Sequence, residues 1–499
     1  IIVRILLDSS KWDHCCFKNA CNVLCKKCEN PTITLCHKII SVLAETTNKQ
    51  YFNRTSNIEQ NVTMKTTIIL LTIILTFVFG TTHSATITCD LIATPYGNTL
   101  ATNILRNAST HHTKTSCLGN TDQNKRITVQ GQVEALYEDS FKDIPKLREI
   151  EIVDATLKEI QPGTFKDLPR LKSVSLEDTN LRELKSGTFV NLETSLLYLG
   201  RNSISVLREG AFQNLWNLRE LSLESNDLRE LKRGVFGNVS LGIFSLGNNS
   251  ISTIEAGTFA EVSGRDKFGI GLSLFKNDIE EIDASVFDNK DIVSLDLGNN
   301  SISVLRPGDL RNLPKLSSIS LSGNKLREVP EGVFSGSKIT SVVLSCNEIS
   351  FIAGGAFDDM KDLYFVDVSN NRVKEWSNNW FRGVESRLSI IFSYNSIEAI
   401  PADAFKNVPE SSSLDLDHNR IQDIPDGAFG GMKGLRRLVL SYNKIRTWKS
   451  DLMRNVQVAT FVDLRGNEIG CPEGGANSLV PGAKMVILDN CRGKGFKFT

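Results

Sequence analysis

An asparagine recurs every 23 or 24 residues through most of this 499-residue chain, and no other feature limits its possible folds more. Each asparagine stands in a segment of the form L-x-L-x-x-N-x-[LIV], and one wider spacing of 28 residues interrupts the series. The twelve anchors are Asn202, Asn226, Asn249, Asn277, Asn300, Asn324, Asn347, Asn371, Asn395, Asn419, Asn443 and Asn467. A fixed period of about 20–50 residues indicates a solenoid, in which each unit packs only on its neighbours.

Each repeat contains a short stretch in which apolar and polar residues alternate, as in Leu221-Ser-Leu223. This alternation is typical of a half-buried β-strand, but three residues are too few to form a stable strand alone. Parallel stacking of successive units lets the strands bond along the whole array. The asparagine follows the strand where the chain turns inward, so its amide is expected to bond to the backbone of the turn.

A phenylalanine stands ten residues after most anchors, and Leu310 and Met453 replace it in two units. The phenylalanines are Phe165, Phe189, Phe212, Phe236, Phe259, Phe287, Phe334, Phe357, Phe381, Phe405 and Phe429. These rings are expected to stack into a spine opposite the strands. Because the strands are about 4.8 Å apart and face bulkier connections, the array is expected to curve into a horseshoe with a concave parallel sheet.

The motif resembles the 24-residue leucine-rich repeat of animal extracellular proteins, including its second half, Pro330-Glu-Gly332-Val-Phe334. Similar arrays occur in Toll-like receptor ectodomains, slit-like proteins and secreted insect immune factors. The resemblance covers residues 127–470, with earlier units that carry Ala155 and Thr179 in place of asparagine. It implies an α/β leucine-rich repeat solenoid of about 14 repeats plus caps, with an irregular or short helical convex side.

The segment 64–85 has the order of a secretory signal peptide. Met64 and Lys65 precede an apolar run over 68–79, which is followed by small residues up to Ala85. Twelve apolar residues are too few to cross a bilayer, which needs about 20. The mature chain is therefore expected to be secreted, and no later apolar run predicts a membrane span.

Residues 1–63 are interpreted as a non-native leader or translated upstream sequence, because a signal peptide works at an N-terminus. A cytosolic arm of a signal-anchored protein is the alternative. This segment holds six of the eleven cysteines, and Cys25 and Cys28 have the spacing of a zinc-binding pair. One such pair is weak evidence for a metal site, and none is predicted.

Cysteines flank the repeats on both sides, where an open solenoid needs caps. Residues 86–126 are interpreted as an N-terminal cap and residues 471–499 as a short C-terminal cap and tail. Because export favours disulfides, we expect Cys89 to pair with Cys117 and Cys471 with Cys491. Cys346 is left over, either as a tolerated thiol or as a link in a dimer.

Exported N-x-[ST] sequons, which predict glycosylation, occur at Asn107, Asn238, Asn248 and Asn299. The wide spacing places about four extra residues within 263–271, and three glycines there predict a mobile loop that bulges outward.

Charge and motifs exclude several functions. Lys plus Arg and Asp plus Glu are 57 each, so nothing favours nucleic-acid binding. The sequence has no HExxH, GxSxG or phosphate-loop motif. The histidines of the mature chain are His111, His112 and His418, and no nucleophile is expected near His418. We therefore predict a protein that is not an enzyme and that needs no cofactor.

The residues six, four, two and one before each anchor are expected to face the concave side. In the N-terminal repeats they are acidic, and in the middle repeats they are mostly serine. The C-terminal repeats mix aromatic and charged residues there: Phe365, Asp367, Tyr394, Asp415, Asp417, His418, Arg437, Tyr442, Phe461, Asp463 and Arg465. Such mixtures are typical of protein-binding hot spots, although a solvated strand face with incidental aromatics is the alternative.

The sequence therefore predicts a secreted recognition module that binds an extracellular protein, or a peptide or glycan with basic groups, in innate immunity or extracellular signalling. The alternatives are a matrix or cell-adhesion protein, or the shed or truncated ectodomain of a receptor. A local cluster on the concave face would favour a binder over a structural scaffold.

Overall fold

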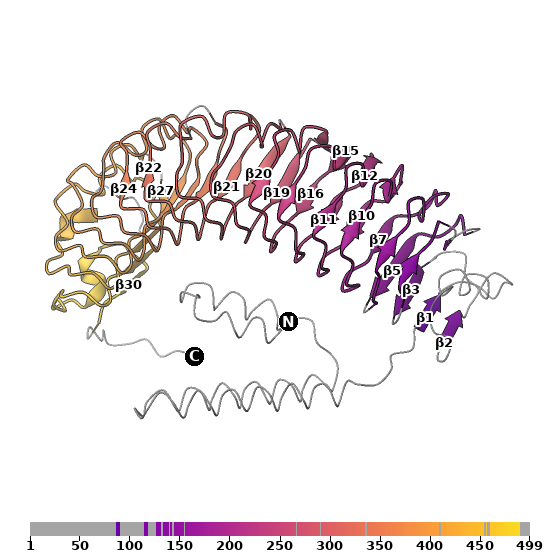
Figure 1. The fold of residues 1–499 in the computed structure, drawn as a ribbon. Coiled ribbons are helices and arrows are strands. Elements are labelled where there is room, and N and C mark those ends of the chain that lie inside the picture. The colour runs from indigo at the N-terminus through magenta and orange to yellow at the C-terminus, as the bar shows by residue number, and fades with distance from the viewer. Residues whose placement is uncertain are drawn as a thin grey trace, which may run out of the picture. The chain divides into compact units, whose positions relative to one another are not determined.

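The structure is a computed structural model of the chain. It describes residues 86–89, 114–117, 126–130 and 133–489, with gaps at 139, 142–143, 154, 266, 290, 335–336, 409–410, 454–455 and 457–459. The signal-like segment 64–85, the segment 1–63, Asn107, His111, His112 and Cys491 lie outside the described residues. Within the unit 84–499, the repeats are stacked along an arc (Figure 1).

One 18-stranded sheet runs through the whole array. Neighbouring strands pair in parallel from one repeat to the next, and the antiparallel pair β1–β3 at the N-terminal end is the exception among the described strands. The predicted solenoid with a parallel concave sheet is therefore confirmed. The strands are β1 (Thr86–Cys89), β2 (Lys114–Cys117), β3 (Arg126–Gln130), β5 (Glu149–Val153), β7 (Ser173–Ser175), β10 (Leu196–Tyr198), β13 (Glu220–Ser222), β16 (Ile243–Ser245), β19 (Ile270–Ser273), β20 (Ile292–Asp296), β21 (Ser318–Ser320), β23 (Ser341–Val343), β25 (Phe365–Asp367), β26 (Leu388–Ile391), β27 (Ser411–Asp415), β28 (Arg437–Val439), β29 (Phe461–Asp463) and β30 (Met485–Ile487).

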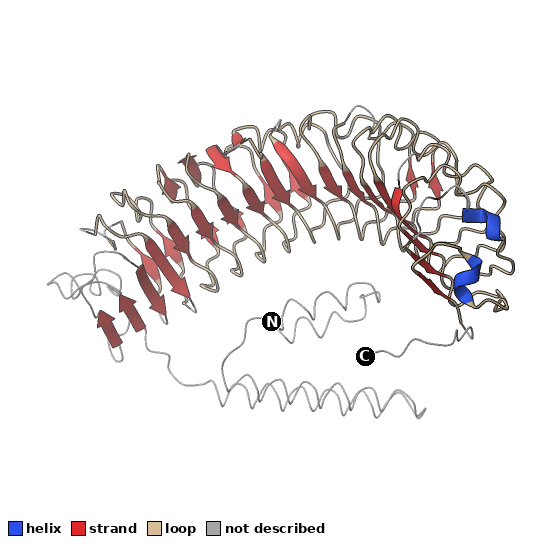
Figure 2. Cartoon of the chain, turned by 180° about the vertical axis from the view of Figure 1, so that it is seen from behind, coloured by secondary structure: helices blue, strands red, loops and turns tan. Residues whose placement is uncertain are grey.

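The connections between these strands are mostly loops and short extended pieces, as the colouring of Figure 2 shows. A second, four-stranded parallel sheet joins β9 (Phe189–Val190), β12 (Phe212–Leu215), β15 (Phe236–Leu241) and β18 (Val262–Gly264). Two-stranded pairs join β4 (Ala135–Leu136) to β6 (Glu159–Ile160), β8 (Glu183–Leu184) to β11 (Val206–Leu207), β14 (Glu230–Leu231) to β17 (Thr253–Ile254), and β22 (Glu328–Val329) to β24 (Phe351–Ile352). Two 3₁₀-helices, η2 (Ser450–Met453) and η3 (Ala476–Leu479), lie near the C-terminal end.

The anchor asparagines bond to the backbone as the sequence predicts. Asn324 is buried, and its Nδ2 donates to the carbonyl oxygens of Leu297, Leu321 and Ser322 at 2.9, 3.0 and 3.3 Å. Its Oδ1 accepts from the Ile302 N–H at 2.9 Å, so one side chain ties two repeats together. Thr179, which replaces an anchor, instead donates from its hydroxyl to Leu176 O at 3.1 Å.

The phenylalanine spine is present but not continuous. Phe165, Phe189, Phe212 and Phe236 stack with ring centroids 5.3–5.5 Å apart, and Phe141 extends the stack at the N-terminal end. Between Phe236 and Phe259, the ring of Phe244 makes edge-on contacts. The rings are spaced more widely than the strands of a parallel sheet, about 4.8 Å, which agrees with the curvature that the sequence predicts.

Indole rings interrupt the spine beneath the C-terminal repeats. Trp376 packs against Phe405 at 4.7 Å and Phe392 at 5.1 Å, and Trp380 stacks on Phe392 at 5.3 Å. Both indoles are buried, and their N–H groups donate to the carbonyl oxygens of Ala404 and Ile352. The core is therefore bulkier and more aromatic below this part of the sheet.

The backbone of the N-terminal cap places two predicted disulfide partners in register. β1 and β2 are paired strands, and Cys89 stands opposite Cys117. A disulfide between these two cysteines stays a prediction. Cys471 is disulfide-bonded, but its predicted partner Cys491 is not described. Cys346 carries a half-buried thiol, and a dimer through it stays a prediction.

The extra residues that the sequence predicts within 263–271 lie in that segment, between two strands, while the mobility and outward direction of the loop stay predictions. Ser263 and Gly264 belong to β18 of the second sheet, and residues from Ile270 onward belong to β19 of the main sheet. Asp291 bonds to both ends of this segment. Its Oδ2 accepts a hydrogen bond from the Gly264 N–H, and its carbonyl oxygen accepts one from the Ile270 N–H. Leu241 pairs with Gly264 and Ile243 pairs with Gly271, so the extra residues lie between β18 and β19, where Phe268 is 74% exposed.

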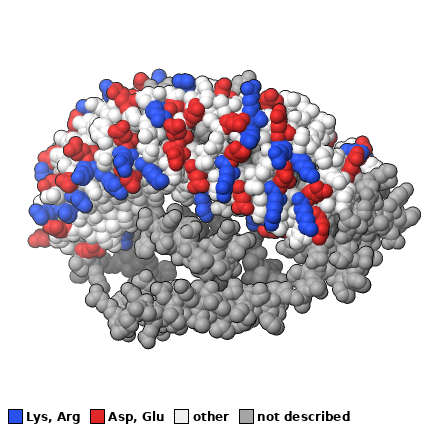
Figure 3. Space-filling view, viewed as in Figure 1, with Lys and Arg blue, Asp and Glu red and all other residues white. Residues whose placement is uncertain are grey.

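Ion pairs between consecutive repeats cover the flank of the array. Lys185 pairs with Glu159, Arg208 with Glu183, and Lys449 with Asp426 at 2.6–3.0 Å. Positive and negative side chains accordingly alternate on the face seen in Figure 3. Exposed pairs of this kind stabilise by about 0–1 kcal/mol each, so the core and the asparagine ladder carry most of the stability. Among the described residues, no helix is long and apolar enough to span a membrane.

Candidate functional site

The concave face carries three different surfaces along the array, and the acidic N-terminal one is internally paired. Arg126 forms ion pairs with Glu149 and Glu151. Arg201 contacts Glu177 at 3.0 Å and Asp178 at 2.8 Å. These acids therefore already have cationic partners, which leaves them less able to attract a basic ligand.

The middle of the array holds small residues and two sequons. Asn248 and Asn299 lie immediately before their anchors and are half-buried, and Asn248 Nδ2 donates to Ser225 Oγ at 2.7 Å. Asn238 lies instead on β15 of the second sheet, where it is exposed. Glycans at Asn248 and Asn299 would cover the middle of the concave edge and leave the C-terminal repeats open; these glycosylations stay predictions.

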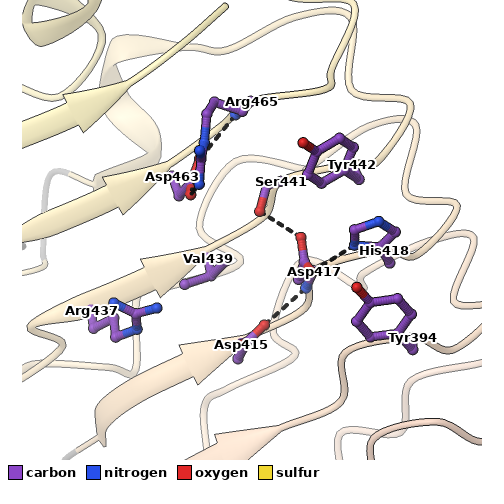
Figure 4. Close-up of a pocket in the computed structure, with 10 residues that line it drawn as sticks. All are labelled: Tyr394, Asp415, Asp417, His418, Arg437, Val439, Ser441, Tyr442, Asp463 and Arg465. Carbon is purple, nitrogen blue, oxygen red and sulfur yellow. Dashed lines mark hydrogen bonds and ion pairs between the residues drawn. The ribbon is translucent and has the colours of Figure 1, made fainter. Parts of the chain in front are cut away.

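The C-terminal repeats form a shallow, open hollow of about 580 Å³. It brings together eight of the eleven concave residues that the sequence predicts for a binding patch, while Phe365, Asp367 and Phe461 lie outside its lining. The hollow is lined by Tyr394, Asp415, Asp417, His418, Arg437, Val439, Ser441, Tyr442, Asp463 and Arg465 (Figure 4). Sequence reasoning missed Val439 and Ser441 because it selected only aromatic and charged residues.

A three-ring stack forms one side of the hollow. The imidazole of His418 lies between the rings of Tyr394 and Tyr442, each 4.3 Å away between centroids, at interplanar angles of 10° and 27°. The outer face of Tyr442 packs on Gly466, where an added Cβ would lie only 2.5 Å from Tyr442 Cδ1. The tyrosines are 49% and 51% exposed; His418 covers one face of each ring, and Gly466 covers the other face of Tyr442.

The backbone under this stack is in an unfavourable conformation for its residues. The position before each anchor has a positive φ from Asp178 to Gly466, with values between 50° and 68°. This left-handed region suits glycine and asparagine, and it costs other residues about 1–2 kcal/mol each. Two tyrosines and a histidine in three successive repeats therefore reduce stability, as binding residues often do.

Asp417 connects the stack to the floor of the hollow. Its Oδ2 lies 2.6 Å from His418 Nδ1, and its Oδ1 accepts a hydrogen bond from Ser441 Oγ at 2.5 Å. The sequence predicts no nucleophile near His418, and the structure corrects this by bringing Ser441 into the same group. However, the carboxylate stands between the hydroxyl and the imidazole, so His418 does not receive the Ser441 proton as a catalytic base would.

Asp415 lies in the floor of the hollow and has a perturbed acidity. Burial raises the pKa of its carboxyl above the ordinary value, and the carboxylates of Asp417 and Asp367 raise it further. The Asp417 N–H, which donates to Asp415 Oδ1 at 3.0 Å, and the guanidinium of Arg437 oppose this rise in pKa. Burial therefore makes the ionised form of Asp415 less favourable in the folded protein than in the unfolded chain.

Replacing Asp415 by Asn is expected to raise the melting temperature at pH 7. A group whose pKa is raised by folding contributes stability below its unfolded pKa, and this contribution is lost as pH rises through the folded pKa. Asn keeps the acceptor for the Asp417 N–H without the charge, so the gain should disappear below the ordinary aspartate pKa of about 3.9. Thermal unfolding at pH 7 and at a pH below about 3.9 measures this difference in melting temperature. Asp296→Asn is the control, since Asp296 caps a turn in the same way outside the hollow; a gain equal to that control would contradict the prediction.

The other charged side chains that line the hollow, Asp463, Arg465 and Arg437, contact neighbouring side chains. Asp463 is 3% exposed, and Arg465 donates to both of its carboxylate oxygens at 2.6–3.2 Å. The guanidinium of Arg437 lies 4.7 Å from the centroid of the Phe461 ring. The hollow is thus rigid and polar, and it contains no group of three or more metal-ligating side chains among the described residues.

Comparisons with known proteins agree with the repeat fold. The family model described as leucine rich repeat matches residues 271–326, 316–373, 361–421 and 409–469, and a BspA type leucine rich repeat region matches 96–206 and 134–266. No curated protein matches the sequence.

Solved structures share the fold at low sequence identity. The Toll–Spatzle complex, titled a molecular hub in Drosophila development and innate immunity, matches at 20% identity and a TM-score of 0.58 over 72% of this chain and 52% of that chain. A Leptospira interrogans leucine-rich repeat protein matches at 19% identity and a TM-score of 0.54, over 72% of this chain and 89% of that chain. A Bacteroides eggerthii leucine-rich repeat protein matches at 19% identity and a TM-score of 0.53, over 78% of this chain and 74% of that chain. This chain thus spans about half of the Toll chain. Together the family models cover most of the described repeats, and the chain belongs to the leucine-rich repeat proteins.

Proposed function

We propose that this protein is a secreted recognition module, and that it binds an extracellular protein through the hollow in its C-terminal repeats. Leucine-rich repeat solenoids are typical protein-interaction scaffolds without enzymatic activity. The observation that carries the proposal is the stack Tyr394–His418–Tyr442, which stands half-exposed on a strained backbone beside a polar hollow. Aromatic residues at the rim of a polar depression are typical of binding hot spots.

The arrangement favours a protein or peptide over a glycan. Sugars usually stack on open aromatic faces, whereas both faces of His418, both faces of Tyr442 and one face of Tyr394 are covered within the stack and by Gly466. Rings held in place in this way lose little conformational freedom on binding, which favours affinity. The local concentration of such residues also supports a specific binder over a uniform matrix scaffold.

Secretion and a role in innate immunity belong to the same proposal. The signal-like segment 64–85 and the sequons support export. The Toll chain, whose fold this array shares, is bound to Spatzle in the matching structure, whose title names innate immunity. Because identity is only 20%, this likeness suggests the kind of role and does not identify a partner.

Replacing Tyr394 by Gly and Tyr442 by Asn is expected to weaken binding by at least about 2 kcal/mol, roughly 30-fold, if they are hot-spot residues. Glycine is used at Tyr394 because asparagine there would complete an N-x-S sequon with Ser396. Gly323 and Asn370 already occupy this position, with φ 68° and 55°, so the double variant should fold at least as stably as the wild type. The measurement is affinity for the partners that the wild-type protein captures from extracellular fluid, with thermal unfolding alongside.

Lys276→Asn supplies the control, because Lys276 occupies the same left-handed position in the middle of the array. It is expected to leave binding unchanged. A double tyrosine variant that is folded and captures every partner with unchanged affinity would place the binding site elsewhere.

A further inference from the structure

The floor beneath the proposed site has an alternating pattern across five neighbouring strands. Each of the strands β25 to β29 carries one residue four positions before its anchor, and these residues pair from strand to strand. In order along the array they are Asp367, Ile391, Asp415, Val439 and Asp463. Aspartates therefore stand on every second strand, with an aliphatic residue between them. Because adjacent strands are about 4.8 Å apart, successive aspartates are separated by roughly 9.6 Å along the array.

Two of these carboxylates can accept bonds from a ligand. Asp367 and Asp415 each use Oδ1 to accept a backbone N–H two residues later, at 2.8 and 3.0 Å. Their Oδ2 atoms take part in none of the bonds of the described residues and are not among the buried unsatisfied atoms, so they reach solvent. Asp463 differs, because Arg465 already neutralises it. The floor thus offers two carboxylate oxygens at a fixed separation.

Peptide conformations differ in how well they match that separation. In a polyproline II helix, residues three apart face the same side and are about 9.3 Å apart. In an extended strand, residues on one side are about 6.8 or 13.6 Å apart. An α-helix repeats its face after seven residues, about 10.5 Å, which is too long because side chains on a concave surface converge.

The side chains at the sides of the hollow also suit a peptide in the polyproline II conformation. A polyproline II backbone has no internal hydrogen bonds, so its carbonyl oxygens need donors from the binding surface. Figure 4 shows Tyr394 and Tyr442 on one side of the hollow and Arg437 on the other. The Tyr442 hydroxyl and the Arg437 guanidinium can donate to ligand carbonyl oxygens.

We propose that the occupant of this site is a peptide segment in the polyproline II conformation, with Lys or Arg at every third residue, whose cations bind Asp367 and Asp415. The proposal rests on the proposed function, since it names the ligand chemistry of the same site. The segment lies along the array, across the strands, with its basic residues over the aspartates and intervening residues over Ile391 and Val439.

Two synthetic peptides test the register. One is acetyl-(Pro-Pro-Lys)₄-amide, and the other has the same composition with its four lysines in one central block. Titration calorimetry with the full chain is expected to give about tenfold tighter binding for the first peptide, because only its charges match the aspartate spacing. Asp367→Ala and Asp415→Asn are each expected to weaken that binding about tenfold. Alanine is used at Asp367 because asparagine there would complete an N-x-S sequon with Ser369.

Asp296→Asn is the matched control, because Asp296 also lies four residues before its anchor and accepts the Gly298 N–H at 2.9 Å, but far from the hollow. It should leave peptide affinity unchanged. Equal binding of the two peptides, or equal effects of all three variants, would overturn the proposed register.

Failure of this inference is distinguishable from failure of the proposed function. If neither peptide binds while the Tyr394 and Tyr442 double variant loses its captured partners, the site is a binding site for a different chemistry. If the double variant keeps those partners, the proposed function fails. A peptide that binds only as an α-helix, seen by circular dichroism, would also overturn the polyproline II assignment.

Discussion

Replacing Asn324 by Ala is expected to lower the free energy of unfolding by about 3–5 kcal/mol, with urea denaturation as the measurement. The side chain makes four hydrogen bonds in a buried position, three to carbonyl oxygens and one from a backbone N–H. Ala leaves the Ile302 N–H without a partner, which costs about 1–3 kcal/mol, and the loss of the other hydrogen bonds adds about 0.5–1.5 kcal/mol each. The three carbonyl oxygens keep other donors, from Asn300, Asn347 and the Asn299 N–H, which limits the total.

Two further variants test that explanation. Asn324→Thr should lose less stability, because Thr179 shows that a hydroxyl at this position bonds to the carbonyl three residues earlier. Asn217→Ala removes a half-buried asparagine whose side chain donates to the side chain of Glu193, and it should cost less than about 1 kcal/mol. A loss at Asn324 as small as at Asn217 would mean that the ladder contributes little.

The ladder and the spine could be predicted from the sequence because both follow the period. A residue type repeated at one position must solve the same packing or hydrogen-bonding problem in each unit, so one repeat explains the others. The exceptions arise where a unit departs from the period. The 28-residue spacing predicts extra length near Gly264, and the extra residues do lie there, between β18 and β19. The bonds by which Asp291 holds Gly264 and Ile270 on either side of them depend on the fold in three dimensions.

The candidate site was predictable as a set of residues but not as an arrangement. The sequence places Tyr394, His418 and Tyr442 at one position of successive repeats, yet their stacking depends on strand separation and on the shared positive φ. The partners of Asp417 were missed because Ser441 is neither aromatic nor charged. Conversely, the acidic N-terminal repeats look available in the sequence, but Arg201 occupies two of their carboxylates.

Replacing Phe405 by Ala is expected to lower the free energy of unfolding by about 3–5 kcal/mol and to weaken partner binding as well. Phe405 is fully buried, and its ring contacts Trp376 at 4.7 Å and Phe429 at 5.7 Å beneath the repeat that carries Tyr394. In a repeat array each unit is stabilised mainly by its neighbours, so the cavity should loosen this region first. Hydrogen exchange is expected to show lost protection around residues 380–430.

Phe212→Ala separates stability from function. Phe212 is equally buried and stacks on Phe189 and Phe236 at 5.5 Å each, so its loss should cost a similar 3–5 kcal/mol, approximately. Its repeat lies far along the array from the hollow, and coupling between repeats passes only through neighbouring interfaces. The variant should therefore lose protection near residue 212 and keep its partner affinity at temperatures where it stays folded. If it loses as much affinity as Phe405→Ala, the array responds as one cooperative body, and the site depends on the whole solenoid rather than on the aromatic core directly beneath it.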